Sequence, residues 1–148
     1  MKTSDSGRRF IEQFEGLFLH AYDDGTGTLT IGYGHTTAAG LPHVYPGMTI
    51  TKDQADAILS SDLAAVEADV AHFVKVPLDQ NQFDALVSFD FNTGALGRSS
   101  LLHAVNSGDV SGVRDDLMMW CHAGGRVLPG LVRRRRAEAD LFNKAVAA

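Results

Sequence analysis

The stretch Phe14–Thr36, FEGLFLHAYDDGTGTLTIGYGHT, joins the end of a helix to an acidic turn and a glycine-rich strand. Apolar residues before it recur at helical spacing, which predicts a short amphipathic helix over residues 4–15, with Gly16 as its C-terminal cap. Residues 23–27 have turn composition. The pattern is strand-like from Tyr22 to Gly34, and after the turn Leu29, Ile31 and Tyr33 alternate with small polar residues, as in a strand.

Three side chains of this stretch can carry chemistry: Glu15, Asp24 and Thr30. A helix end, a turn and the returning strand of a hairpin can bring all three to one wall of a cleft. Two carboxylates in different environments suit glycoside hydrolysis, in which one acid stays protonated and the other stays ionised. Spacing alone leaves an alternative open, in which Glu15 is a solvated helix end and Asp24 only forms the turn.

The remainder of the chain has helical patterns. Thr51 and Gln54 form a capping box before a helix that continues to about residue 73. Further helices are expected from Asp79 to a stop at 92–94, over about 98–107 and 109–122, and after Pro129. The predicted fold is therefore α+β and mostly α, with a small β-containing lobe (about 10–50), a connector helix (about 51–73) and a helical lobe (about 78–148).

Composition narrows the classes of function. The chain has 148 residues, a formal net charge of −5 and one cysteine, Cys121. The length fits one domain, and the acidic balance argues against a general nucleic-acid binder. One cysteine cannot form an intramolecular disulfide, which fits synthesis in a reducing cytoplasm, and Cys121 is expected to be a small buried apolar residue. We expect no signal peptide and no membrane insertion.

The motif Glu15-Gly16, Ala21-Tyr22, Asp24 and Thr30-Ile31-Gly32-Tyr33-Gly34-His35-Thr36 resembles the phage-type lysozymes, also called endolysins or muramidases. Weaker resemblance follows at residues 91–94, Trp120 and residues 130–135, so it covers nearly the whole chain. The resemblance implies a two-lobed, mostly α fold and hydrolysis of the β-1,4 bond between N-acetylmuramic acid and N-acetylglucosamine in peptidoglycan. It implies an inverting reaction with Glu15 as general acid, while Asp24 and Thr30 position the water.

The same resemblance implies a structural ion pair between His35 and Asp62, which is expected to lower the pKa of Asp62. It implies an enzyme without cofactor that acts as a monomer on the cell wall, after release by a holin-type pore or by lysis. The histidines lack metal-ligand spacing, so no metal is expected. Two rival functions stay open: a catalytically silent wall-binding module, and a lytic transglycosylase that leaves an anhydro-sugar end.

The only basic cluster is Arg133–Arg136. It could contact the anionic wall, but four consecutive residues span about 400° of a helix and cannot share one face. We expect some of these arginines to pair with nearby acids such as Glu138 and Asp140.

Overall fold

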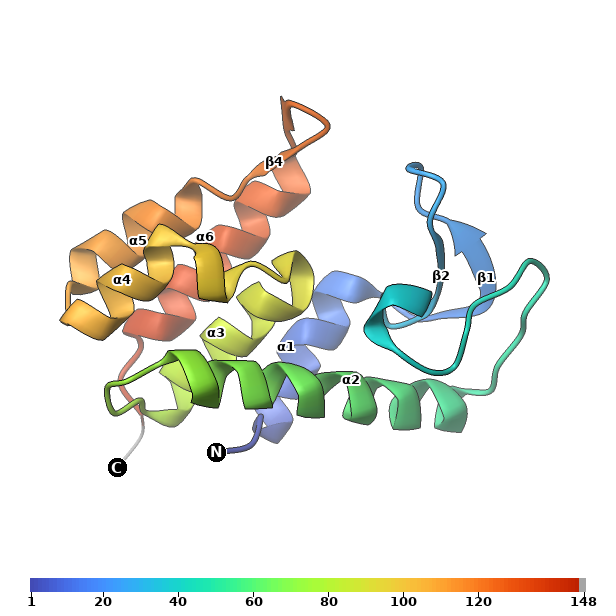
Figure 1. The fold of residues 1–148 in the computed structure, drawn as a ribbon, viewed down its shortest axis with the longest axis horizontal. Helices are drawn as coiled ribbons and strands as arrows, with labels where there is room; N and C mark the ends of the chain where they lie inside the picture. Colours follow the sequence, from blue (N-terminus) through green and yellow to red (C-terminus); the bar gives the residue numbers. More distant parts are fainter. Residues whose placement is uncertain (147–148) are drawn as a thin grey trace. The chain divides into compact units, whose positions relative to one another are not determined.

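The computed structural model describes residues 1–146. The small sheets and the helices follow one another along the chain as shown in Figure 1. The elements are α1 (Asp5–Glu15), β1 (Phe18–Asp23), β2 (Leu29–Gly32), β3 (His35–Thr36), η1 (Thr37–Ala39), α2 (Lys52–Phe73), α3 (Gln80–Thr93), η2 (Leu96–Arg98), α4 (Ser100–Ser107), α5 (Val110–Met118), β4 (His122–Ala123), β5 (Arg126–Val127) and α6 (Pro129–Asn143). The chain is α+β and mostly α, as predicted.

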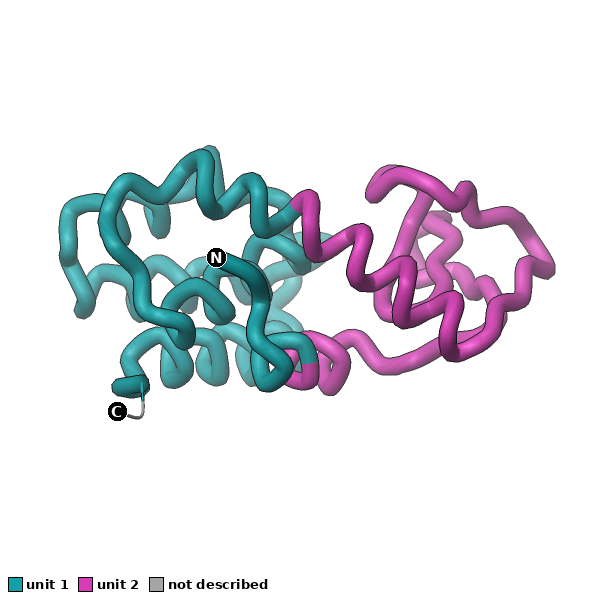
Figure 2. Tube along the Cα trace, turned by 90° about the horizontal axis from the view of Figure 1, so that it is seen from below, with its two compact units in different colours: residues 1–8, 66–148 teal, residues 9–65 magenta. Residues whose placement is uncertain are grey.

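The chain divides into two compact units, coloured separately in Figure 2. One unit is Arg9–Ala65, and the other combines Met1–Arg8 with Val66–Ala148. The division falls inside α1 and inside α2, so each of these helices contributes residues to both units.

The unit of residues 9–65 contains a three-stranded antiparallel sheet in the order β1-β2-β3. Its apolar centre consists of Ile31, Val44 and Met48, against which Ala21, Leu29 and Ile50 pack. The turn between β2 and β3 is Tyr33-Gly34, and both Gly32 (φ 65°) and Gly34 (φ 73°) have left-handed backbone. Glycine adopts this conformation without the steric cost that a Cβ brings.

The other unit, which we call the helical unit, is built around α3. Eight consecutive residues of this helix, Phe83–Asp90, are buried. A helix that is buried on every side must be surrounded by other elements, and α6 lies alongside it. The helix begins after Asp79, as predicted, with a capping box in which Asp79 accepts from the amide of Gln82 and the Gln82 side chain accepts from the amide of Asp79. At the other end, Gly94 caps the helix in the left-handed conformation, and the buried Asp90 accepts from the amide of Leu96.

Two local predictions were wrong. The helix predicted over 109–122 ends at Met118, and a hairpin of β4 and β5 follows it. Gly124 (φ 59°) and Gly125 (φ 76°) form the two-residue turn that such hairpins favour. The backbone of Cys121, a buried free cysteine, accepts from the amide of Leu128 and closes the hairpin. Strand β1 also starts at Phe18, four residues before the strand-like pattern begins at Tyr22.

The arginine run divides between the interior and the surface. Arg134 and Arg135 are buried, and both pair with the buried Glu138, at 3.5 Å and 2.6 Å. Arg133 and Arg136 are exposed. Pairing with Glu138 is therefore confirmed, whereas Asp140 pairs with Arg114, at 2.6 Å, and not with the run.

No helix among residues 1–146 is long and apolar enough to span a bilayer.

The predicted pair of His35 and Asp62 joins β3 to α2. His35 Nδ1 lies 2.7 Å from Asp62 Oδ2, and both side chains are buried. His35 Nε2 lies 2.9 Å from the carbonyl oxygen of Pro42, which can only accept, so Nε2 carries a proton. The short contact at Nδ1 then requires one more proton, held on the ring or on the carboxyl group.

The expected lowering of the pKa of Asp62 is wrong. Burial raises the pKa of this carboxyl group and outweighs the opposing hydrogen bond and charge of His35. Desolvation penalises the charged form of an acid, and the sequence alone did not reveal how deeply Asp62 is buried.

Substitution of Asp62 by Asn should destabilise the protein most at acidic pH. A raised folded pKa gives stability that is fully present below the unfolded value, here 3.8, and is lost as pH rises through the folded value. We expect a loss of about 1–2 kcal/mol at the acid end that shrinks toward neutral pH. Urea unfolding at a series of pH values, with the exposed Asp115→Asn as control, measures this difference. A loss that grows toward neutral pH would show that an ionised carboxylate stabilises the pair.

Candidate active site

Glu15 is the last residue of α1, and its side chain lies over the β2–β3 turn. A Cβ built on Gly34 would overlap the Glu15 carboxyl group, so only glycine leaves room for it. The chain leaves the helix at Gly16, whose left-handed backbone (φ 71°) reverses its direction into β1. Glycine at position 34 is therefore required for two reasons: its left-handed backbone conformation and the closeness of the Glu15 carboxyl group.

Asp24 lies in the turn between β1 and β2, where its carboxylate is exposed and hydrogen-bonded. Its Oδ1 accepts from the Thr26 hydroxyl at 2.6 Å and from the Thr26 amide at 2.9 Å. These bonds lower the pKa of Asp24, the hydroxyl of Thr26 contributing most. The neighbouring Asp23 accepts from the amides of Gly25 and Gly27 and thereby fixes the turn. Asp24 is thus held as an ion whose Oδ2 can accept a water molecule.

Thr30 stands on β2, directly opposite Tyr22 of β1. It is 5% exposed, and its hydroxyl donates to the carbonyl oxygen of Thr28 at 3.4 Å. A hydroxyl that donates still has lone pairs with which to accept, so Thr30 can orient a polar partner next to it.

Tyr22 is related to all three predicted residues, through charge to Glu15 and Asp24 and through strand pairing to Thr30. Burial raises the pKa of the Tyr22 phenol, and the negative charges of Glu15 and then Asp24 raise it further. Both carboxylates therefore act on the same phenol, whose own strand position faces Thr30. Tyr22 belongs to the sequence motif, but no role was predicted for it. The available signal was its place in the chain between Glu15 and Asp24, two residues before Asp24.

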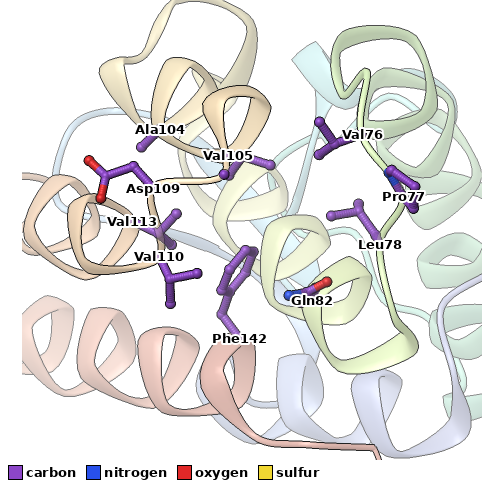
Figure 3. A pocket seen from close by; sticks show the side chains of 11 residues that line it. Val76, Pro77, Leu78, Gln82, Ala104, Val105, Asp109, Val110, Val113 and Phe142 are labelled. Carbon is purple, nitrogen blue, oxygen red and sulfur yellow. The ribbon is translucent and has the colours of Figure 1, made fainter.

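A separate pocket of ≈ 180 Å³ lies in the helical unit. Figure 3 shows Phe142, Val113, Val105 and Leu78 around it. Its two polar side chains have structural roles, since Gln82 completes the capping box of α3 and Asp109 caps α5. This pocket lacks the pair of carboxylates that Glu15 and Asp24 provide. Within residues 1–146, no three His, Cys, Asp or Glu side chains are close enough together to hold a metal ion.

Comparison with known proteins gives consistent results over nearly the full length. The family model described as phage lysozyme matches residues 12–138. An endolysin of Acyrthosiphon pisum secondary endosymbiont phage 1 is 44% identical, over 98% of this chain and 100% of that protein. The solved endolysin from Escherichia coli O157:H7 phage FAHEc1 has a TM-score of 0.87 at 38% identity, covering 100% of this chain and 97% of its own. The muramidase domain of SpmX from Asticaccaulis excentricus has a TM-score of 0.86 at 39% identity, with coverage of 97% and 99%.

Proposed function

Because the chain belongs to the phage lysozyme family and is a lysozyme-type hydrolase, we propose that it hydrolyses the glycan strands of bacterial peptidoglycan. The bond cut is the β-1,4 link between N-acetylmuramic acid and N-acetylglucosamine. The observation that carries this proposal is that one small sheet and the elements next to it hold all three residues: Glu15 over the β2–β3 turn, Asp24 in the β1–β2 turn and Thr30 on β2. We expect a monomer that needs no cofactor or metal and acts on the wall after release from the cell that makes it.

The resemblance to phage-type lysozymes gives Glu15 the role of general acid, and the surroundings of Asp24 and Thr30 suit the positioning of water. Glu15 donates its proton to the glycosidic oxygen as the bond to the leaving sugar breaks. Asp24 is ionised and exposed, so it can accept a proton from a water molecule that Thr30 helps to orient. Attack by that water on the opposite face of the sugar inverts the anomeric carbon. The products carry one added water, and a mass spectrum of the released fragments therefore separates hydrolysis from a transglycosylase reaction.

Substitution of Glu15 by Gln should abolish most of the lytic activity. Glutamine has nearly the same shape but no acidic proton, and general acid catalysis contributes about 10²- to 10⁴-fold. The decrease in turbidity of purified peptidoglycan, with native protein and variant at equal concentration, measures the effect. Equal thermal midpoints would show that the variant folds. Retention of more than about a tenth of the native rate would contradict the assignment of Glu15.

The position of Glu15 can be tested through Gly34. A methyl group there overlaps the Glu15 carboxyl group, whereas Gly47, in a similar left-handed conformation (φ 80° against 73°), has open space around its Cβ position. Both variants to Ala carry the same kind of backbone strain. We expect Gly34→Ala to lower kcat about 10²-fold, since small displacements of catalytic groups cost this much, while Gly47→Ala keeps the native rate. Equal losses in the two variants would show that strain, and not the contact with Glu15, is responsible.

The net charge predicts an unusual salt dependence. The protein carries −5, and two of the four clustered arginines are buried against Glu138. Long-range attraction to an anionic wall should be weak or repulsive, so the rate should hold steady or rise as salt screens charge over about 10 Å at 0.1 M. Initial rates on purified peptidoglycan across a salt series provide the measurement. A steep, continuous fall would show that Arg133 and Arg136 dominate binding.

A further inference from the structure

Strand β1 contains a bulge that brings two aromatic residues together. Phe18 pairs with Gly32 and Tyr22 pairs with Thr30, so a separation of four residues on β1 matches a separation of two on β2. The bulged backbone is held from its other side, because the Leu19 carbonyl accepts from the amide of Ile50 and the Ala21 amide donates to the carbonyl of Met48. Backbone hydrogen bonds on both edges of β1 therefore fix the positions of Phe18 and Tyr22 relative to one another.

The bulge gives Phe18 and Tyr22 a common face. Residues directly opposite one another in an antiparallel pair project to the same side of the sheet, as do residues two apart on one strand. Phe18, Tyr22 and Thr30 therefore project together. The rings of Phe18 and Tyr22 lie 4.4 Å apart, at 42° to one another.

In the chain, the aromatic pair lies between the two carboxylates of the candidate site, Glu15 and Asp24. The Phe18 ring covers Gly16, the residue after Glu15, and approaches its Cβ position within 3.4 Å. Tyr22 precedes the turn that carries Asp24. Phe18 is nevertheless 44% exposed, and the adjacent Leu17 and Leu19 are more than a third exposed. An exposed aromatic surface beside reactive groups is typical of a binding site.

We propose that Phe18 and Tyr22 form a platform on which one sugar ring of the glycan stacks. This proposal rests on the proposed function and adds a binding surface to it. A pyranose ring has a face of C–H groups and a rim of hydroxyl groups. The aromatic rings fit the face, and the nearby carboxylates of Glu15, Asp23 and Asp24 can accept from the hydroxyl groups. The same carboxylates disfavour an anionic lipid surface, which is the other ligand that an exposed apolar patch could take.

The deciding variant is Phe18→Leu, which keeps an apolar side chain against Gly16 but removes the aromatic face. The substrate is soluble, uncross-linked glycan strands, for which KM and kcat are measured separately. We expect KM to rise about three- to tenfold, the scale of a single aromatic contact, with kcat within about twofold of native, and Phe18→Tyr to restore the native KM. Tyr45→Ala removes another exposed aromatic ring (58%) of the same unit and should leave KM unchanged.

A second measurement does not depend on catalysis. Binding of an N-acetylglucosamine hexasaccharide to the Glu15→Gln protein, followed by calorimetry, should weaken by the same factor when Phe18→Leu is added. Unchanged affinity and KM in Phe18→Leu, or a loss that Phe18→Tyr does not restore, would overturn the platform. So would Phe18-dependent binding to anionic phospholipid vesicles with glycan affinity unchanged. Failure of the proposed function is distinct, because native protein would then release no fragments from peptidoglycan.

Discussion

The β2–β3 turn is the constraint on which the candidate site depends. Gly32 and Gly34 both adopt left-handed backbone, and this places Tyr33 between two strands that are only a few residues long. The turn has to pass close beneath the Glu15 carboxyl group, and glycine at position 34 is what permits that approach. The residue that follows, His35, is then directed into the interior, where it meets Asp62 of α2. This short turn thus determines both how close the Glu15 carboxyl group lies and where His35 pairs with Asp62.

The carboxylates near this turn show how surroundings divide roles between similar groups. Asp24 is exposed, and its ionised form is favoured by two hydrogen bonds from Thr26. Asp62 is buried, and desolvation favours its protonated form even though a histidine nitrogen lies 2.7 Å away. Hydrogen bonding decides in the first case and burial in the second. A carboxyl group beside a histidine is therefore not always ionised more easily.

The features that the sequence predicted well are those governed by neighbours along the chain. The capping boxes of Thr51 with Gln54 and of Asp79 with Gln82 begin α2 and α3 where expected, since each involves residues three apart. The bulge of β1 could not be predicted in this way, because it depends on pairing with residues 48–50, far along the chain. The pKa of Asp62 depends on burial, and the division of the arginine run depends on the interior position of Glu138. The hairpin of residues 122–127 did carry a local signal, Gly124-Gly125, but the short strands on either side lack an alternating apolar pattern that would have predicted it.

The buried arginines also bear on how an acidic enzyme can bind an acidic polymer. Arg134 and Arg135 both pair with Glu138, and Ser88 donates to the same carboxylate at 2.6 Å. The charges of these two arginines are therefore paired inside the helical unit. Burying such charges is costly unless they are paired and hydrogen-bonded, as these are. Their charge is then largely cancelled locally and contributes little to attraction at a distance. Under the proposed function, affinity for the glycan therefore comes from contacts at short range. For a sugar these are hydrogen bonds to its hydroxyl groups and apolar contacts with its C–H face. The sheet face that carries Thr30 has groups suited to both kinds of contact, because Asp24 lies in the adjoining turn and Phe18 and Tyr22 project from the same face.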